Sequence, residues 1–139
     1  MAKVKVLMGL KGAGKTKELI SLVTAALEVE HGHVVCLEKE RKLTFDIPRE
    51  ARLITASDYA ISGPEFLKGF ISGLYAGNYD ITHIFIDSLY KIAPFAGDVH
   101  AVEMFVDWLD AFGEANNIKF TVSISADVNG ASEGIRKYF

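Results

Sequence analysis

Apolar residues in this chain follow two alternating patterns along the sequence. Short apolar runs of strand length occupy residues 3–8, 33–37, 51–55, 82–86 and 118–125. Apolar positions three or four residues apart predict amphipathic helices over 15–30, 64–77 and 101–113. Strands that alternate with helices predict an α/β fold in three layers, with a mostly parallel sheet of about five strands and helices on both faces.

Several boundaries of these elements have specific signals. Gly32 follows the first helix in the usual stop position, and Ser62 precedes the second helix as its expected N-cap. The segment 39–50 is ambiguous, because Phe45 and the apolar residues two positions on either side of it alternate as in an edge strand. After the last strand, we expect one turn of helix near 132–138.

Composition restricts the class of protein that these elements can build. The chain has 139 residues, of which 50% are apolar and 24% are charged, so it can form a core and is not disordered. We expect one domain over 1–139, because no internal linker interrupts the pattern. The net charge of −3 does not suit a protein that coats nucleic acid, so a polyanionic ligand has to meet a local cationic site.

Cysteine content and hydropathy bear on the compartment. Cys36 is the single cysteine, which excludes an internal disulfide and favours the reducing cytoplasm. The first eight residues alternate lysine with apolar residues and lack the apolar centre of a signal peptide. No stretch approaches about 18 uncharged apolar residues, so we expect no membrane span.

The strongest chemical signal lies between the first strand and the first helix. The segment Gly9-Leu10-Lys11-Gly12-Ala13-Gly14-Lys15-Thr16 fits the phosphate-binding pattern G-x-x-x-x-G-K-[ST] at every fixed position. Glycines let the backbone curl so that successive N–H groups face one anion, and the helix N-terminus adds partial positive charge. We expect Lys15 to reach the β- and γ-phosphates of a nucleotide and the Thr16 hydroxyl to bind Mg²⁺. The predicted nucleotide-contacting residues are Gly9, Lys11, Gly12, Ala13, Gly14, Lys15, Thr16 and Lys17.

A second signal is an apolar strand that ends in an acid. The run Ile84-Phe85-Ile86-Asp87 has the form of a Walker B strand. Ligands of parallel α/β sheets bind at the carboxyl ends of the strands, where an aspartate can hold Mg²⁺ or its bound water. We predict that Asp87 and Thr16 hold the metal ion. The alternative is that Asp87 caps a loop or helix locally.

With these motifs in this order of elements, the chain resembles the RecA-like branch of P-loop ATPases. The stretch from Ile86 to Pro94 is similar to the segment that follows the Walker B strand in that branch. The resemblance implies a catalytic glutamate after the second strand, with Glu40 as the base that orients water and Glu38 as the alternative. The other interpretation is that both glutamates are solvated charges at a strand end.

Three positions qualify the resemblance. Ser88 stands where many P-loop ATPases have a water-activating glutamate, so either the base lies elsewhere or hydrolysis is slow. Ser125 or Asp127 is a candidate sensor of the γ-phosphate, unless these side chains bond only to local backbone.

The chain is also similar to the core of thymidine kinase, but it lacks the cysteines of that enzyme's zinc-binding segment.

The sequence therefore predicts a Mg²⁺-dependent ATP-binding protein with slow hydrolysis. The alternatives are a non-catalytic nucleotide-sensing module that binds a protein partner, and a small-molecule kinase of the nucleoside type. RecA's long DNA-binding loops have no counterpart in this chain, so we do not expect nucleic acid as a partner. A second copy of the chain or another protein is a candidate partner, and a membrane is not.

Overall fold

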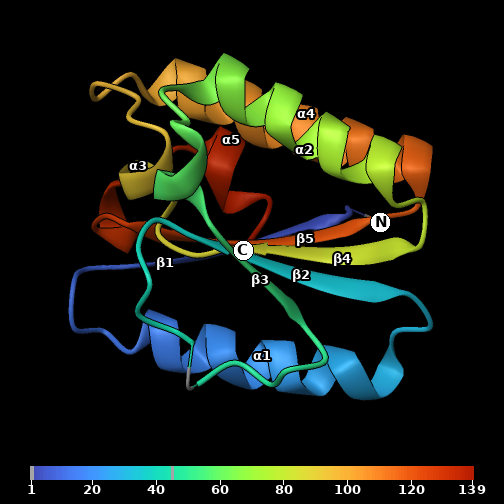
Figure 1. The fold of residues 1–139 in the computed structure, drawn as a ribbon. Coiled ribbons are helices and arrows are strands. Elements are labelled where there is room, and N and C mark those ends of the chain that lie inside the picture. Colours follow the sequence, from blue (N-terminus) through green and yellow to red (C-terminus); the bar gives the residue numbers. More distant parts are fainter. Residues whose placement is uncertain (1, 45) are drawn as a thin grey trace.

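The computed structural model describes residues 2–44 and 46–139 (Figure 1). Its strands are β1 (Val4–Gly9), β2 (His33–Glu38), β3 (Arg52–Thr55), β4 (Ile81–Ile86) and β5 (Lys119–Ser125). Its α-helices are α1 (Lys15–Val29), α2 (Pro64–Gly77), α3 (Leu89–Ile92), α4 (Val99–Asn116) and α5 (Glu133–Arg136). Two 3₁₀ turns, η1 (Ala56–Tyr59) and η2 (Val128–Gly130), complete the described elements.

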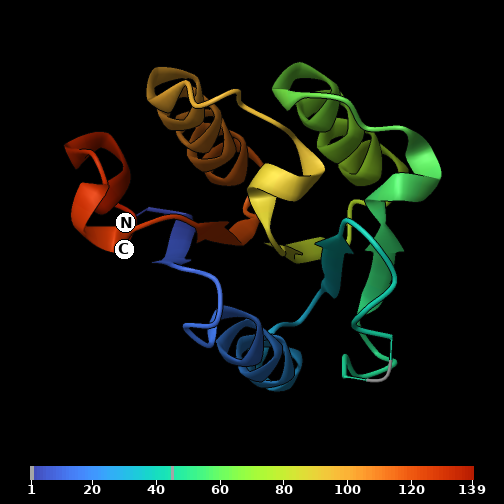
Figure 2. The same cartoon turned by 90° about the vertical axis from the view of Figure 1, so that its left-hand side faces the viewer.

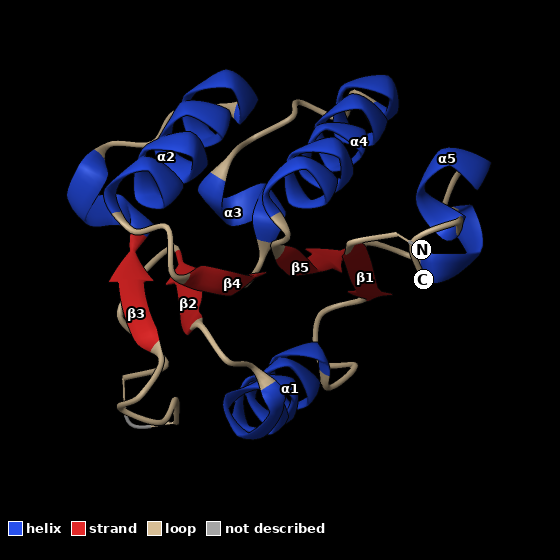
Figure 3. Ribbon diagram, turned by 90° about the vertical axis from the view of Figure 1, so that its right-hand side faces the viewer, coloured by secondary structure: helices blue, strands red, loops and turns tan. Residues whose placement is uncertain are grey.

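The five strands form one sheet in which every pair of neighbours is parallel, in the order β1-β5-β4-β2-β3. Helix α1 covers one face, and α2, α3 and α4 cover the other (Figures 1 and 3). The predicted α/β class, the sheet of about five parallel strands and the helices on both faces are therefore confirmed. Helix α5 lies beside β1, where Val6 N–H donates to the carbonyl of Tyr138 over 2.8 Å.

Burial on both faces explains why the central strands are continuous apolar runs. In β4, Ile84 and Ile86 face the cluster formed with α2 and α4, and Phe85 between them faces the cluster formed with α1. All three are fully buried. A strand between two helical layers needs apolar residues at every position rather than at every second one.

Because all strands are parallel, their carboxyl ends lie at one edge of the sheet, which Figure 2 faces. The register pairs Gly9 with Ser125, Val122 with Ile86, and Ile86 with Leu37. The loops that follow β1, β5, β4 and β2 therefore meet at this edge. Strand β5 separates the glycine-rich loop from the strand that ends at Asp87.

The structure settles one ambiguous segment, contradicts one local prediction and adds one helix that was not predicted. The described residues of the ambiguous segment, 39–44 and 46–50, form turns and bends rather than a strand, and Leu43 is buried against the α1 cluster. Phe45 lies outside the described residues. Helix α2 is capped by Gly63 instead of Ser62, with no side-chain hydrogen bond at the cap. The short helix α3 directly after the Asp87 strand was not predicted.

The role predicted for Gly32 was also wrong. Helix α1 ends at Val29, and its C-cap residue Glu30 has extended backbone. Gly32 is not among the positive-φ glycines of the described chain. A Cβ atom at this position would instead collide with the carbonyl oxygen of Asp80 and the side chain of Thr82. Glycine is therefore required here because two backbone segments approach closely. It does not serve as a helix stop in the left-handed conformation.

This difference predicts the stability of two glycine variants. Gly32→Ala should lower the free energy of unfolding by about 1–3 kcal/mol, because the rigid neighbours have to move. Gly69→Ala in α2 is the matched control, since nothing lies within 4 Å of its added methyl group, and it should stabilise the protein by about 0.5–1 kcal/mol. Urea unfolding of both variants measures these changes. Equal stabilities would contradict the steric role of Gly32.

Candidate functional site

The glycine-rich loop joins β1 to α1 at the carboxyl edge of the sheet. Gly12 and Gly14 have φ angles of 88° and 86°, in the left-handed region that glycine alone adopts without strain. Ala13 N–H donates to the carbonyl of Leu10 over 3.0 Å, which closes the turn, and α1 begins directly afterwards at Lys15. The loop therefore presents free backbone N–H groups and a helix N-terminus together, which is the arrangement that suits an anion.

The two polar side chains of the pattern lie at the start of this helix. Lys15 is half-buried, and its ammonium group donates to the carbonyl of Leu10 over 3.0 Å. Thr16 is exposed. Both line one cavity of about 390 Å³, together with Gly12 and Gly14. The cavity therefore opens directly onto the phosphate-binding pattern.

Asp87 lines the same cavity from the other side, at the end of β4. Its backbone N–H donates to the carbonyl of Leu37 over 2.9 Å, which fixes the chain as it leaves the strand. The buried Ser123 hydroxyl donates to Asp87 Oδ1 over 3.1 Å and accepts from Ser88 N–H over 2.7 Å. One serine on β5 thus holds both residues that follow the β4 strand.

The protonation of Asp87 reflects two opposing effects. Burial raises the pKa of its carboxyl above the ordinary value, while the hydrogen bond from Ser123 and the nearby lysines act in the opposite direction. Lys15 is one of those lysines. The electrostatic coupling of Lys15 and Asp87 across the cavity is what a site for a phosphate and its accompanying cation requires.

Lysines dominate the charge of this cavity. Asp87 is the only acid in its lining, which holds five lysines: Lys11, Lys15, Lys17, Lys42 and Lys91. Within the described residues, none of the five forms a salt bridge with a carboxylate of the protein. Five ammonium groups without acidic partners repel one another, so an anion in the cavity would relieve that repulsion.

Sequence reasoning missed the lysines on the far side of this cavity. Lys42 follows β2 and Lys91 lies in α3, and both side chains are exposed. Lys42 belongs to no motif, and Lys91 lies in the stretch 86–94 without a role predicted for it. Only the neighbouring positions of β2 and β4 in the sheet bring them to the glycine-rich loop.

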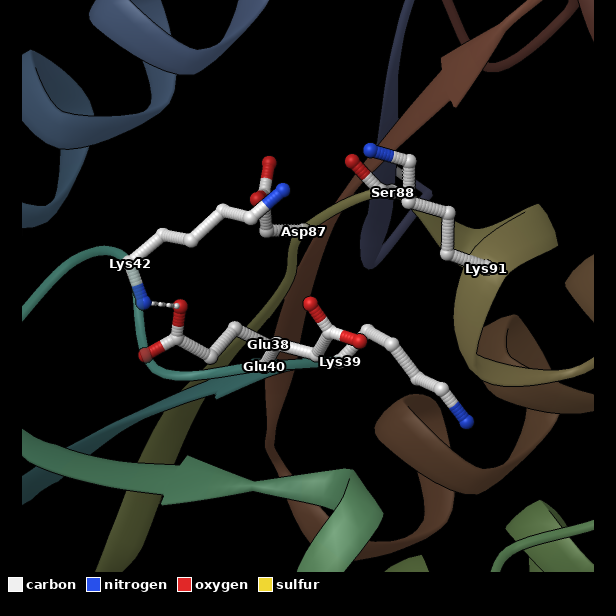
Figure 4. Close-up of a pocket in the computed structure, with 7 residues that line it drawn as sticks. All are labelled: Glu38, Lys39, Glu40, Lys42, Asp87, Ser88 and Lys91. Carbon is white, nitrogen blue, oxygen red and sulfur yellow. Dashed lines mark hydrogen bonds between the residues drawn. The ribbon is translucent and has the colours of Figure 1, made fainter.

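The two predicted glutamates have different environments. Glu38, at the end of β2, is 2% exposed, and its Oε1 accepts from the backbone N–H groups of Lys42 and Leu43 over 3.0 and 3.2 Å. Its other oxygen has no hydrogen-bond partner among the described residues. Glu40 is exposed and lines a second cavity of about 340 Å³, beside Asp87 (Figure 4). Glu38 therefore holds the loop that carries Lys42, while Glu40 is free to meet a ligand.

The remaining predicted residues differ in their relation to the cavity that the glycine-rich loop lines. Ser125 lines it, whereas Asp127 accepts from Asn129 N–H over 3.0 Å and caps the turn η2. Gly9 and Ala13 are not in the lining. The carbonyl of Gly9 accepts from Ala126 N–H over 3.1 Å, which ties the loop to the end of β5.

Asp87 would need further ligands from outside its own strand to hold a cation. Within residues 2–44 and 46–139, no three His, Cys, Asp or Glu side chains are grouped so that they could hold a metal by themselves. Mg²⁺ accepts one or two protein ligands and completes its shell with phosphate oxygens and water. Asp87 and Thr16, which line one cavity, fit that mode of binding. None of the described helices has the length and apolar character needed to cross a membrane.

The Ser123 contacts predict a local effect that does not depend on any ligand. Ser123→Ala leaves the Ser88 N–H without its acceptor, which should cost about 1–3 kcal/mol of unfolding free energy. It also removes a hydrogen bond to the charged form of Asp87, so the pKa of that carboxyl should rise further. Urea unfolding and a carbon-13 NMR titration measure the two effects. Ser125→Ala is the matched control, because this exposed serine should change neither quantity.

Comparison with known proteins adds no relative to the resemblance that the sequence motifs suggest. No model of a known protein family matches the chain, and no curated protein matches it either. The α/β fold with its parallel sheet is shown, and membership of the RecA-like branch stays a prediction.

Proposed function

We propose that the protein binds a nucleoside triphosphate, with ATP as the expected one, in complex with Mg²⁺. The single observation that supports this most is the shared cavity, in which the glycine-rich loop faces Asp87, Lys42 and Lys91, with three further lysines on the loop side. A triphosphate carries about four negative charges, which five unpaired ammonium groups would offset. The second cavity beside Asp87 contains no residue of the glycine-rich loop.

Different residues of this cavity would bind the phosphates and the Mg²⁺ ion. The loop N–H groups and Lys15 would hold the β- and γ-phosphates, for which Lys15 would exchange its bond to the Leu10 carbonyl for one to phosphate oxygen. Thr16 and Asp87 would hold Mg²⁺, which neutralises phosphate charge. Ser123 would keep the Asp87 carboxylate turned toward the ion through its 3.1 Å hydrogen bond.

Two observations support slow hydrolysis. Ser88 has no carboxylate to activate water, and its neighbour Asp87 is already held by Ser123. Glu40 is exposed and lines only the second cavity, so bulk water competes for its carboxylate. A nucleotide-sensing module without turnover is therefore the second candidate function. The role of Glu40 in orienting water stays a prediction.

Removing the loop lysine tests nucleotide binding. Lys15→Ala should weaken the Kd for Mg-ATP by about 10- to 100-fold, since a charge-assisted contact to phosphate is lost. Isothermal titration calorimetry measures the Kd, and circular dichroism shows whether the fold is retained. Lys5→Ala removes the same charge from an exposed position on β1 and should bind like the parent protein. Equal binding by Lys15→Ala and the parent would make the loop purely structural.

Phosphate release separates the enzyme from the sensor. If Glu40 orients water, Glu40→Gln should retain the Kd for Mg-ATP and lose turnover by at least about tenfold. Glu28→Gln, at an exposed position on α1, is the matched control. Release by the parent that does not exceed the buffer blank over a range of protein concentrations would favour the sensor. Unchanged turnover in Glu40→Gln would remove Glu40 from the mechanism.

A further inference from the structure

The second cavity adjoins the nucleotide cavity. Both are lined by the same four residues, Lys42, Asp87, Ser88 and Lys91. The second cavity contains no residue of the glycine-rich loop and is completed by Glu38, Lys39 and Glu40 (Figure 4). A γ-phosphate held between the loop and Asp87 would therefore face this second space across the shared wall.

The size of the second cavity exceeds what hydrolysis needs. Its volume is about 340 Å³. One water molecule takes up roughly 30 Å³ in the liquid, and sites for small ligands begin at about 300 Å³. The space next to the proposed γ-phosphate position is thus large enough for a small molecule.

The lining of this cavity defines the chemistry of its ligand. It contains no aromatic residue and no aliphatic one other than the lysine stems, so it offers no surface on which a nucleobase would stack. Within the described residues, Lys39, Lys42 and Lys91 form no salt bridge with a carboxylate. Such unpaired ammonium groups favour an anionic ligand.

Only one of the three acids is free to take a proton from such a ligand. Glu38 is buried and accepts two backbone N–H groups, and Asp87 is held by Ser123. Glu40 is exposed and has no hydrogen bond or salt bridge among the described residues. Glu40 lines the cavity together with Lys39 and Lys42 from its own loop and Lys91 from α3 (Figure 4).

We propose that the second cavity binds a small hydroxyl compound that carries its own phosphate or carboxylate group, and that this hydroxyl receives the γ-phosphoryl group. The proposal rests on the proposed nucleotide site. Lys39, Lys42 and Lys91 bind the anionic group, and Glu40 faces the hydroxyl. The acceptor class differs from a nucleoside, which this polar lining does not fit.

The transfer is balanced in atoms and charge. Glu40 accepts the proton of the acceptor hydroxyl as its oxygen forms a bond to the γ-phosphorus. The bond from that phosphorus to the β–γ bridging oxygen breaks, and its electron pair leaves with ADP. Lys42 and Lys91, which line both cavities, neutralise charge on the oxygens of the group in transit. Glu40 then releases its proton to water.

Radiolabelled transfer tests the acceptor class. The full chain is incubated with Mg²⁺ and γ-labelled ATP, and with glycerol 3-phosphate, glycerate, glycerol, thymidine or water alone. Label on glycerol 3-phosphate or glycerate, at a rate at least about tenfold above that for uncharged glycerol, supports the proposal. Label on thymidine only, or label released only as inorganic phosphate, overturns it. Calorimetry with Mg-ATP on the same samples separates this failure from a failure of the proposed function, in which no nucleotide binds.

Reversing the charge of a lysine that lines only the second cavity tests whether the lysines there bind the anionic acceptor. The measured quantity is the KM for that acceptor. Lys39 lines that cavity and not the nucleotide cavity. Lys39→Glu should raise the KM for the anionic acceptor by about 10- to 100-fold and change the Kd for Mg-ATP by less than about twofold. Lys5→Glu, with the same charge change at an exposed site on β1, should alter neither value. Equal acceptor KM values for the two variants would overturn the role of the lysine cluster.

Discussion

The parallel alignment of the strands is the constraint on which every feature of this site depends. Because β1, β5, β4 and β2 all run in one direction, their carboxyl ends meet at one edge of the sheet. The glycine-rich loop leaves that edge from β1, Asp87 leaves it from β4, and Lys42 follows β2. A single antiparallel strand among these four would have carried its loop to the opposite end of the molecule.

Electrostatics give this edge its chemical character. The chain as a whole is slightly acidic, with a net charge of −3, yet five lysines and one aspartate line the nucleotide cavity. Clustered like charges destabilise a fold unless something offsets them. Glu38 does not serve that purpose, because it is engaged with backbone N–H groups, and Asp87 supplies one negative charge against the five lysines. The excess positive charge at this edge is what makes an anionic ligand the simplest explanation of the site.

The sequence predicted the elements well where local physics dominates. Helix α2 begins at Pro64 and ends at Gly77, as its apolar spacing indicates, and the loop of residues 9–14 lies between β1 and α1. Prediction failed where contacts with segments distant in the sequence determine the local conformation. Gly32 is required by the approach of Asp80 and Thr82, and no neighbour in the sequence reveals that contact. The turns of residues 39–44 and 46–50 are likewise set by Leu43 packing against α1 and by Glu38 holding the loop.

For the candidate site, the sequence by itself determined which groups are present and their local conformation. Gly12, Gly14 and Lys15 are adjacent in the chain, so the pattern alone specifies a loop that curls around an anion. Only the tertiary structure decided what faces that loop. The order of the strands brought Asp87, Lys42 and Lys91 to it, buried Glu38 and left Glu40 exposed beside a second cavity. These side chains are far from the loop in sequence, and their positions follow from strand pairing and burial, which no local pattern encodes.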